Sequence, residues 1–247
     1  MRWTRAIDLT FLLSRQTQSA VTGCPTGRAR TGTPRSRGVC GCPVRLRACL
    51  AGGNHSPEVH WHIIRCLVGE QKFGLAEEES YRLLNEHPEM TPVFVTLAQI
   101  AFLTEDYPLA IDHATKAISQ GVRMADACFI RAYAHARLGN FNVALANIKV
   151  SLAESNRETE FRAEAPYLLH GAILKQLQQH RDALLAYERA LRVNENSTDA
   201  LLGQWDCYQQ LQMAPAPFLV AEEMLRSTRS RSKPCRRVLC LIDNMRV

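Results

Sequence analysis

Between residues 57 and 225 the hydrophobic and polar positions alternate with the period of an α-helix. Apolar residues recur three and four positions apart in one segment after another, and Ala, Leu, Glu, Gln and Arg dominate these segments. Those residue types favour helices, and an apolar period near 3.6 indicates a helix with one buried face. The pattern therefore predicts a succession of amphipathic helices.

The helical segments repeat every 34 residues. The segment LTEDYPLAIDHATKAIS matches RLGNFNVALANIKVSLA at this offset, so that Ala110 aligns with Ala144. A step of 34 backward reaches Ala76, whereas the step forward to Ala183 is 39, because five more residues stand in the polar stretch around 154–164. A fixed period of this size is typical of helical repeat proteins. The predicted repeats span 57–90, 91–124, 125–158 and 164–197, and a degraded fifth begins near 198.

This unit resembles the tetratricopeptide repeat (TPR), a 34-residue helical hairpin with small residues where its two helices cross. The matching small residues are Ala98, Ala132 and Gly171 at the eighth place, Ala76, Ala110, Ala144 and Ala183 at the twentieth, and Ala117, Ser151 and Ala190 at the twenty-seventh. Ile64, Trp205 and Leu83 depart from these columns, and the closing proline is matched only by Pro88. The resemblance covers about 57–225 and implies an all-α fold, an α-solenoid of four TPR-like repeats plus a degraded fifth.

Composition separates the ends of the chain from its middle. The whole chain has 247 residues and a net charge of +6, but residues 1–56 carry +8 and 226–247 carry +6, whereas 57–225 carry −8. Both ends lack a sustained period, and their basic, apolar-poor composition predicts disorder. We therefore expect a basic N-terminal segment (1–56), a TPR solenoid (57–225) and a basic C-terminal tail (226–247). The prolines of the Ala-Pro-Ala-Pro-Phe run at 214–218 are expected to break the second helix of the fifth repeat.

The resemblance also implies a binding site. TPR proteins usually bind ligands in a concave groove formed by the first helix of each repeat. The places that point inward predict a peptide-binding groove that includes Trp61, Arg65, Val95, Gln99, Phe102, Phe129, Tyr133, Arg137, Leu168 and Lys175. Aromatic and Arg side chains are frequent anchors of protein interfaces. The same residues also suit packing between adjacent repeats, so a structural role remains open for each.

Co-chaperone TPR domains hold a C-terminal carboxylate with Lys, Asn and Arg side chains at fixed places. The corresponding residues here are Trp61, Arg65, Thr96, Asp126 and Ile130 or, one repeat later, Val95, Gln99, Ile130, Ala165 and Leu169. Neither set supplies that pattern, so binding of chaperone C-terminal tails is disfavoured.

Cysteine and histidine spacing does not predict a metal site. Cys40 and Cys42 are one residue apart and no second Cys pair follows Cys49, whereas zinc sites usually pair ligands two to four residues apart. Cys66, Cys128 and Cys207 fall on apolar helix positions and are expected to be small core residues. No glycine-rich phosphate loop, Gly-x-Ser-x-Gly motif or helical His pair is present. We therefore expect a protein that is not an enzyme and has no cofactor.

The basic ends leave several alternatives open. The Ser-Arg dipeptides at 227–232 are compatible with phosphate contacts, but no aromatic residues alternate with the bases, so a nucleic-acid role is not favoured. A membrane-spanning helix is not expected, because no apolar run reaches about 18 residues. The Arg-rich, acid-poor start resembles a mitochondrial transit peptide, so the expected compartment is the cytoplasm, with mitochondria as the alternative. The abrupt change at Arg226 also fits a variant or truncated form of a longer TPR protein.

The sequence thus predicts a protein–protein interaction module. It would bind an extended peptide or an amphipathic helix of a partner protein and act as an adaptor or assembly scaffold. The alternative is a small TPR chaperone that shields an aggregation-prone segment of a client. The identity of the partner does not follow from the residues.

Overall fold

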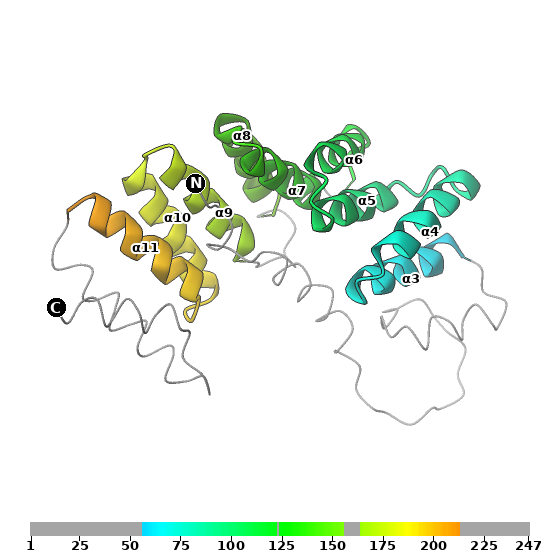
Figure 1. The fold of residues 1–247 in the computed structure, drawn as a ribbon, viewed down its shortest axis with the longest axis horizontal. Coiled ribbons are helices and arrows are strands. Elements are labelled where there is room, and N and C mark those ends of the chain that lie inside the picture. Colours follow the sequence, from blue (N-terminus) through cyan, green and yellow to red (C-terminus); the bar gives the residue numbers. More distant parts are fainter. Residues whose placement is uncertain (1–55, 123, 156–163, 213–247) are drawn as a thin grey trace, which may run out of the picture. The chain divides into compact units, whose positions relative to one another are not determined.

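The computed structural model describes residues 56–122, 124–155 and 164–212, and all helices in these ranges are α-helices with no strand among them. Their bounds are α3 (Pro57–Gly69), α4 (Phe73–Glu86), α5 (Pro92–Leu103), α6 (Tyr107–Ser119), α7 (Met124–Arg137), α8 (Phe141–Ser155), α9 (Ala165–Gln176), α10 (His180–Val193) and α11 (Thr198–Gln210). Figure 1 shows them as consecutive helical hairpins. The predicted all-α repeat fold is confirmed.

The hairpins coincide with the repeats expected from the 34-residue period. The first helices α3, α5 and α9 each pack against the helix that follows, and α11 begins where the fifth repeat is expected. The described residues fall into two compact units, which we treat separately. Unit 2 contains those up to Ala134, and unit 1 begins at His135 near the end of α7. The basic segment before residue 56, the tail after 225 and the proline-rich run at 214–218 lie outside the described residues.

The turn that follows each first helix has the same backbone conformation at the same place. Its central residue has a positive φ of 61° at Gln71, 63° at Glu105, 82° at Gly139, 63° at Gln178 and 52° at Gln212. These positions are separated by 34, 34, 39 and 34 residues, as the repeats are. Side chains with a Cβ are disfavoured in this left-handed region, yet four of the five turns use Gln or Glu. The turn geometry is therefore imposed by the packing of the two helices and not by the local residue type.

The small residues of the TPR-like columns occupy the helix crossings. Ala76, Ala110, Ala144 and Ala183 have no exposed surface, and neither do Ala98, Ala132, Ala117 and Ala190. The polar member of the columns, Ser151, is 1% exposed. A backbone can approach a neighbouring helix closely only where large side chains are absent. These columns thus set the distance between the helices of the hairpins α5–α6 and α9–α10.

Two residues that depart from the columns are nevertheless part of the core of unit 2. Ile64 is 1% exposed and Leu83 is 2% exposed. They belong to one buried cluster with Val68, Val93 and Leu97, which joins α3, α4 and α5. The first repeat therefore fills its crossing with larger side chains than the following repeats do.

In unit 1 a tyrosine ring lies between two glycines of the neighbouring helices. A Cβ added at Gly171 on α9 would stand 2.7 Å from the Tyr187 ring, and one added at Gly203 on α11 would stand 2.3 Å from it. Both distances are too short for any real side chain. Tyr187 itself is 3% exposed, and this burial raises the pKa of its hydroxyl far above the ordinary value. The ring thus joins α9, α10 and α11 through positions that only glycine permits.

The three cysteines of the described residues are buried, as expected from their apolar helix positions. Cys66 is 9% exposed, Cys128 1% and Cys207 0%. Burial raises the pKa of the Cys207 thiol to about 11. Because a thiol reacts as its thiolate, Cys207 is an inert core residue at neutral pH.

Glycine at the left-handed turn positions is expected to stabilise the protein. Glu105→Gly and Gln178→Gly should each raise the free energy of unfolding by about 0.5–1 kcal/mol, because relief of the left-handed strain outweighs the added entropy of the unfolded chain. Gly139→Ala should lower it by about 1 kcal/mol for the converse reason. Urea unfolding followed by circular dichroism measures all three. A loss of stability in both glycine variants would contradict the strain argument.

The close approach at Tyr187 is tested by a pair of glycine substitutions. Gly203→Ala should lower the free energy of unfolding by about 1–3 kcal/mol, because the methyl group overlaps the Tyr187 ring and the helices must move apart. Gly74→Ala is the matched control, since Gly74 also lies inside a helix but a Cβ there meets nothing within 4 Å. This control should gain about 0.5–1 kcal/mol from the better helix former. If both substitutions changed the free energy of unfolding equally, the contact with Tyr187 would not limit how closely the helices approach.

Candidate functional site

The ten residues predicted to form a binding groove all lie on first helices of the hairpins. Trp61 and Arg65 lie on α3, whereas Val95, Gln99 and Phe102 lie on α5, Phe129, Tyr133 and Arg137 on α7, and Leu168 and Lys175 on α9. We call the part in unit 2, from Trp61 to Tyr133, the first-helix surface. Arg137, Leu168 and Lys175 belong to unit 1 and are described there.

Trp61 connects α3 to α5 and also holds a cation. Its indole N–H donates a hydrogen bond of 3.0 Å to the Thr96 hydroxyl. The Arg65 guanidinium lies 5.2 Å from the centre of its ring, within the range of a cation–π contact. The His62 ring is 5.1 Å away on the same helix. Burial and the positive charge of Arg65 lower the pKa of His62, so the imidazole is neutral at pH 7 and Arg65 supplies the positive charge here.

Phe102 and Tyr133 pack edge to face between α5 and α7. Their ring centres are 4.6 Å apart with an interplanar angle of 83°. Phe102 also meets Tyr107 at the start of α6, at 6.4 Å. Phe102 is 4% exposed and Tyr133 6%, so the pair is core packing. Val95 and Phe129 are buried to the same degree.

The accessible part of the first-helix surface is consequently narrower than the sequence indicated. Trp61, Arg65 and Gln99 retain intermediate exposure on α3 and α5, whereas the predicted aromatic residues Phe102 of α5 and Phe129 and Tyr133 of α7 are buried. The three side chains combine an apolar ring, a positive charge and an amide that both donates and accepts. This combination can contact an apolar side chain, a carboxylate and a peptide backbone of a ligand.

In unit 1 the predicted residues have different environments. Leu168 is completely buried and belongs to the core. The Lys175 ammonium donates a hydrogen bond of 2.7 Å to the Asp206 carboxylate, which ties α9 to α11. Arg137 has intermediate exposure at the end of α7. Leu168 is therefore omitted from the candidate site, and Lys175 shares its charge with a neighbour within the chain.

Two partners were not anticipated from the sequence. In the sequence, Thr96 stands at a place where the co-chaperone pattern is not met. In the structure its hydroxyl accepts the hydrogen bond from the Trp61 indole N–H. Asp206 was not considered, although it lies 31 positions after Lys175, close to one repeat. Both pairs could have been found from the repeat period. Residues about one repeat apart lie on equivalent faces of successive first helices, so their side chains can meet.

His170 on α9 is the most perturbed histidine of unit 1. Both nitrogens of its ring are buried without a hydrogen-bond partner in the described part of the chain. Burial, with the nearby charges of Lys149 and Arg189, lowers its pKa to about 4, against a smaller opposite effect of Asp182. The ring is thus neutral in the folded protein at pH 7.

The described ranges contain no group of three His, Cys, Asp or Glu side chains placed to hold a metal ion. Cys24, Cys40, Cys42 and Cys49 of the basic segment lie outside these ranges, so the absence of a metal site there stays a prediction. No helix in the described part of the chain is long and apolar enough to cross a membrane.

Solved structures with the same fold are TPR proteins. MamA superposes with a TM-score of 0.60 at 15% identity, over 69% of this chain and 96% of that one. YrrB, described as a TPR protein with an unusual peptide-binding site, gives 0.58 at 12% identity, over 75% and 93%. Yeast Tom70 gives 0.60 at 14% identity, over 77% of this chain and 39% of its own. The sequence matches no protein-family model and no curated protein. The resemblance to TPR proteins is therefore confirmed at the level of the fold.

The neutral state of His170 makes stability depend on pH. Its pKa is about 4 in the folded protein and 6.5 in an unfolded chain, so the unfolded chain binds the proton first as pH falls. The free energy of unfolding should be constant near neutral pH, decrease below about 6.5 and continue to decrease until about 4. His170→Gln should reduce this slope, leaving the part that comes from His62 and His113, whose pKa values are also lowered. Urea unfolding across this pH range measures the effect, and identical slopes in both proteins would contradict it.

Proposed function

We propose that this chain is a protein-interaction module that binds a segment of a partner protein on the first-helix surface. The observation that carries the proposal is the partly exposed pair Trp61 and Arg65, held in place by the bond to Thr96 and by the cation–π contact. Gln99 is partly exposed on α5, the next first helix. Interfaces gain most from aromatic and Arg anchors that are already ordered, because little side-chain entropy is lost on binding.

The buried aromatic pair provides this order. Phe102 and Tyr133 fix α5 against α7, and the Trp61–Thr96 bond fixes α3 against α5. The exposed side chains therefore stand on helices that do not have to rearrange when a ligand binds. Phe102, with its structural role, and Gln99, with its proposed binding role, are therefore close neighbours on α5.

The ligand that fits is an extended peptide or an amphipathic helix with acidic and apolar side chains. Arg65 favours a carboxylate, the Trp61 ring favours an apolar or planar group, and Gln99 can pair with a peptide bond. The fold likeness to YrrB, whose description includes a peptide-binding site, supports a peptide ligand. An adaptor or scaffold role without catalysis or cofactor is part of the same proposal, as is location in the cytoplasm, where buried thiols such as Cys128 stay reduced.

Arg65→Glu tests the proposal directly. Peptides are first selected with the full chain from a random phage-displayed library, and their affinities are then measured by fluorescence anisotropy. We expect the selected peptides to be rich in acidic and apolar residues, and Arg65→Glu to weaken their binding at least about tenfold, which corresponds to about 1.4 kcal/mol. Introducing a charge at Phe129 or Tyr133 is unsuitable, because each side chain is buried and the variant would lose its fold.

Lys116→Glu is the matched control, because it makes the same change of charge on α6, a second helix. Binding should be unaffected by it. If Arg65→Glu and Lys116→Glu weaken binding equally, the ligand is held by overall charge. If neither does, the binding site lies elsewhere on the chain. A chaperone role would appear as selection of purely apolar peptides with no dependence on Arg65.

A further inference from the structure

One face of α3 is buried apart from the core cluster that joins this helix to α4 and α5. Val59 is 7% exposed and Cys66 is 9% exposed, and Ile63 lies between them and packs against them. Spacings of four and three residues place all three on one side of the helix, which we call the Val59 face. In the described part of the chain, this hydrophobic cluster contains residues of α3 alone. A single helix leaves its surface side chains open to solvent, so a further segment has to cover this face.

The Val59 face has an equivalent one repeat later. Its residues stand 34 positions before three residues of α5, which are Val93, Leu97 and Ile100. On α5 these side chains are buried in one cluster with Leu83 of α4, so the second helix of the preceding hairpin helps to cover them. By the repeat period, the cover of α3 is therefore expected 34 residues before α4, within residues 39–52.

Residues 43–51, which lie outside the described ranges, have the sequence pattern of such a helix. Six of these nine residues are apolar. Leu46, Cys49 and Leu50 are three and four positions apart, the spacing that puts side chains on one helix face. Pro43 stands at the start, and proline also occupies the first turn of α3, α5, α6 and α9. Two glycines follow directly, and glycine often ends a helix. The composition of the basic segment as a whole predicts disorder, and this stretch departs from it.

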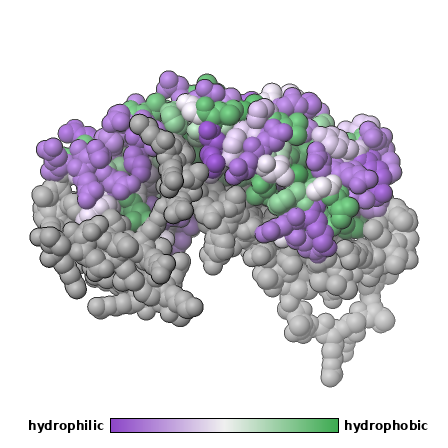
Figure 2. All heavy atoms as spheres, viewed as in Figure 1, coloured by the Kyte–Doolittle hydropathy of each residue, from purple (hydrophilic) through white to green (hydrophobic). Residues whose placement is uncertain are grey.

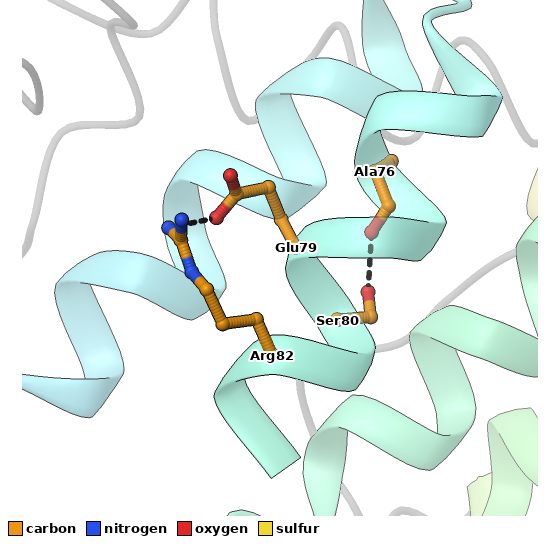
Figure 3. A network of polar contacts seen from close by, with 4 residues as sticks. All are labelled: Ala76, Glu79, Ser80 and Arg82. Carbon is orange, nitrogen blue, oxygen red and sulfur yellow. Dashed lines mark hydrogen bonds and ion pairs between the residues drawn. The ribbon is translucent and has the colours of Figure 1, made fainter. Parts of the chain in front are cut away.

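The register with α4 places the apolar residues of this stretch on the inward side. Leu46 corresponds to Ser80 and Cys49 to Leu83, and both residues of α4 are buried. The Ser80 hydroxyl donates a hydrogen bond of 2.6 Å to the Ala76 carbonyl, which satisfies its polar group within the helix (Figure 3). A leucine at the equivalent place carries no polar group to satisfy. The stretch is thus suited to pack on α3 as α4 packs on α5.

The link to α3 has a length that this fold already uses. Five residues, 52–56, separate the stretch from α3, and five residues, 87–91, separate α4 from α5. A cover on so short a link is present at a high effective concentration, which favours it over a second copy or a partner protein. Hydrophilic residues predominate on the described surface drawn in Figure 2, in keeping with apolar helix faces that are covered.

We propose that residues 43–51 dock on the Val59 face of α3 as the second helix of an incomplete preceding repeat. The repeat is incomplete because the place of its first helix, 23–35, is rich in Gly, Pro, Thr and Arg and has no apolar period. Trp61 and Arg65 are each two positions from Ile63, about 200° around the helix. The docked segment therefore caps one side of α3 and leaves the first-helix surface on the other side open. The proposal does not depend on whether a peptide binds there.

The access of a reagent to Cys66 measures whether the Val59 face is covered. The full chain is treated with iodoacetamide, and the labelled fraction of Cys66 is followed by peptide mass spectrometry. Labelling should be slow in the wild-type chain. Leu46→Glu with Leu50→Glu puts charges on the apolar side of the segment and should raise the rate at least about tenfold, because the cover then opens more often. Cys128 of α7 is 1% exposed and serves as the internal reference, which should stay protected.

Val44→Glu with Ala48→Glu is the matched control. The added charge and the spacing are the same, but the two positions correspond to Glu78 and Arg82 of α4, which are exposed. In Figure 3 the Arg82 side chain lies on the side of α4 away from Ser80. This control should be labelled at the rate of the wild-type chain.

A milder variant keeps the test decisive if the glutamates unfold the chain, which circular dichroism and labelling of Cys128 reveal. Leu46→Ala with Leu50→Ala removes the contacts from a helix-forming sequence and should raise the labelling rate of Cys66 in the same direction. The proposal is overturned if Cys66 is labelled rapidly in the wild-type chain, if neither variant of the two leucines accelerates labelling, or if the control accelerates it equally. Protection of Cys66 that is lost on dilution of the wild-type chain would also overturn it, because a second copy would then be the cover.

Discussion

The close approach of helices at small residues is the constraint on which the rest of this structure depends. Each hairpin brings two backbones together at alanines with no exposed surface, such as Ala110 and Ala183. The turn between the helices then has to reverse the chain in three residues, which forces a positive φ even on Gln71, Glu105 and Gln178. Local strain in the turns is thus a consequence of packing in the crossings. In unit 1 the need for small residues is strictest at Gly171 and Gly203, because both lie against the Tyr187 ring.

This packing also determines which side chains are available for binding. Once the crossings fix the helices, the first helices of unit 2 meet through Phe102 and Tyr133 and through the Trp61–Thr96 bond. Phe102, Phe129 and Tyr133, the aromatic residues at the inward positions of α5 and α7, are consequently buried. The residues that keep exposed surface, Trp61, Arg65 and Gln99, are those at the margin of this packing. The proposed binding site therefore depends on how the repeats of unit 2 are joined.

The sequence predicted the architecture well because repetition multiplies a weak local signal. Four aligned alanines, from Ala76 to Ala183, located the hairpins to within a few residues. The sequence could not distinguish residues that pack between repeats from residues that are accessible to a ligand. Helix geometry defines which positions point inward, whereas the exposure of a side chain depends on the size of its neighbours in the next repeat. Leu168 was therefore predicted as a groove residue and is completely buried. Gly203 was overlooked, although a glycine inside a predicted helix often marks a close contact.

Hydrogen exchange of the full chain, with and without a selected acidic peptide, tests the central claim most directly. The claim is that preordered first helices bind the ligand while the second helices serve to pack them. The account predicts slower amide exchange in α3 and α5 when the peptide is bound, and unchanged exchange in α4 and α6. Protection confined to α4 and α6, or spread evenly over all helices, would contradict it.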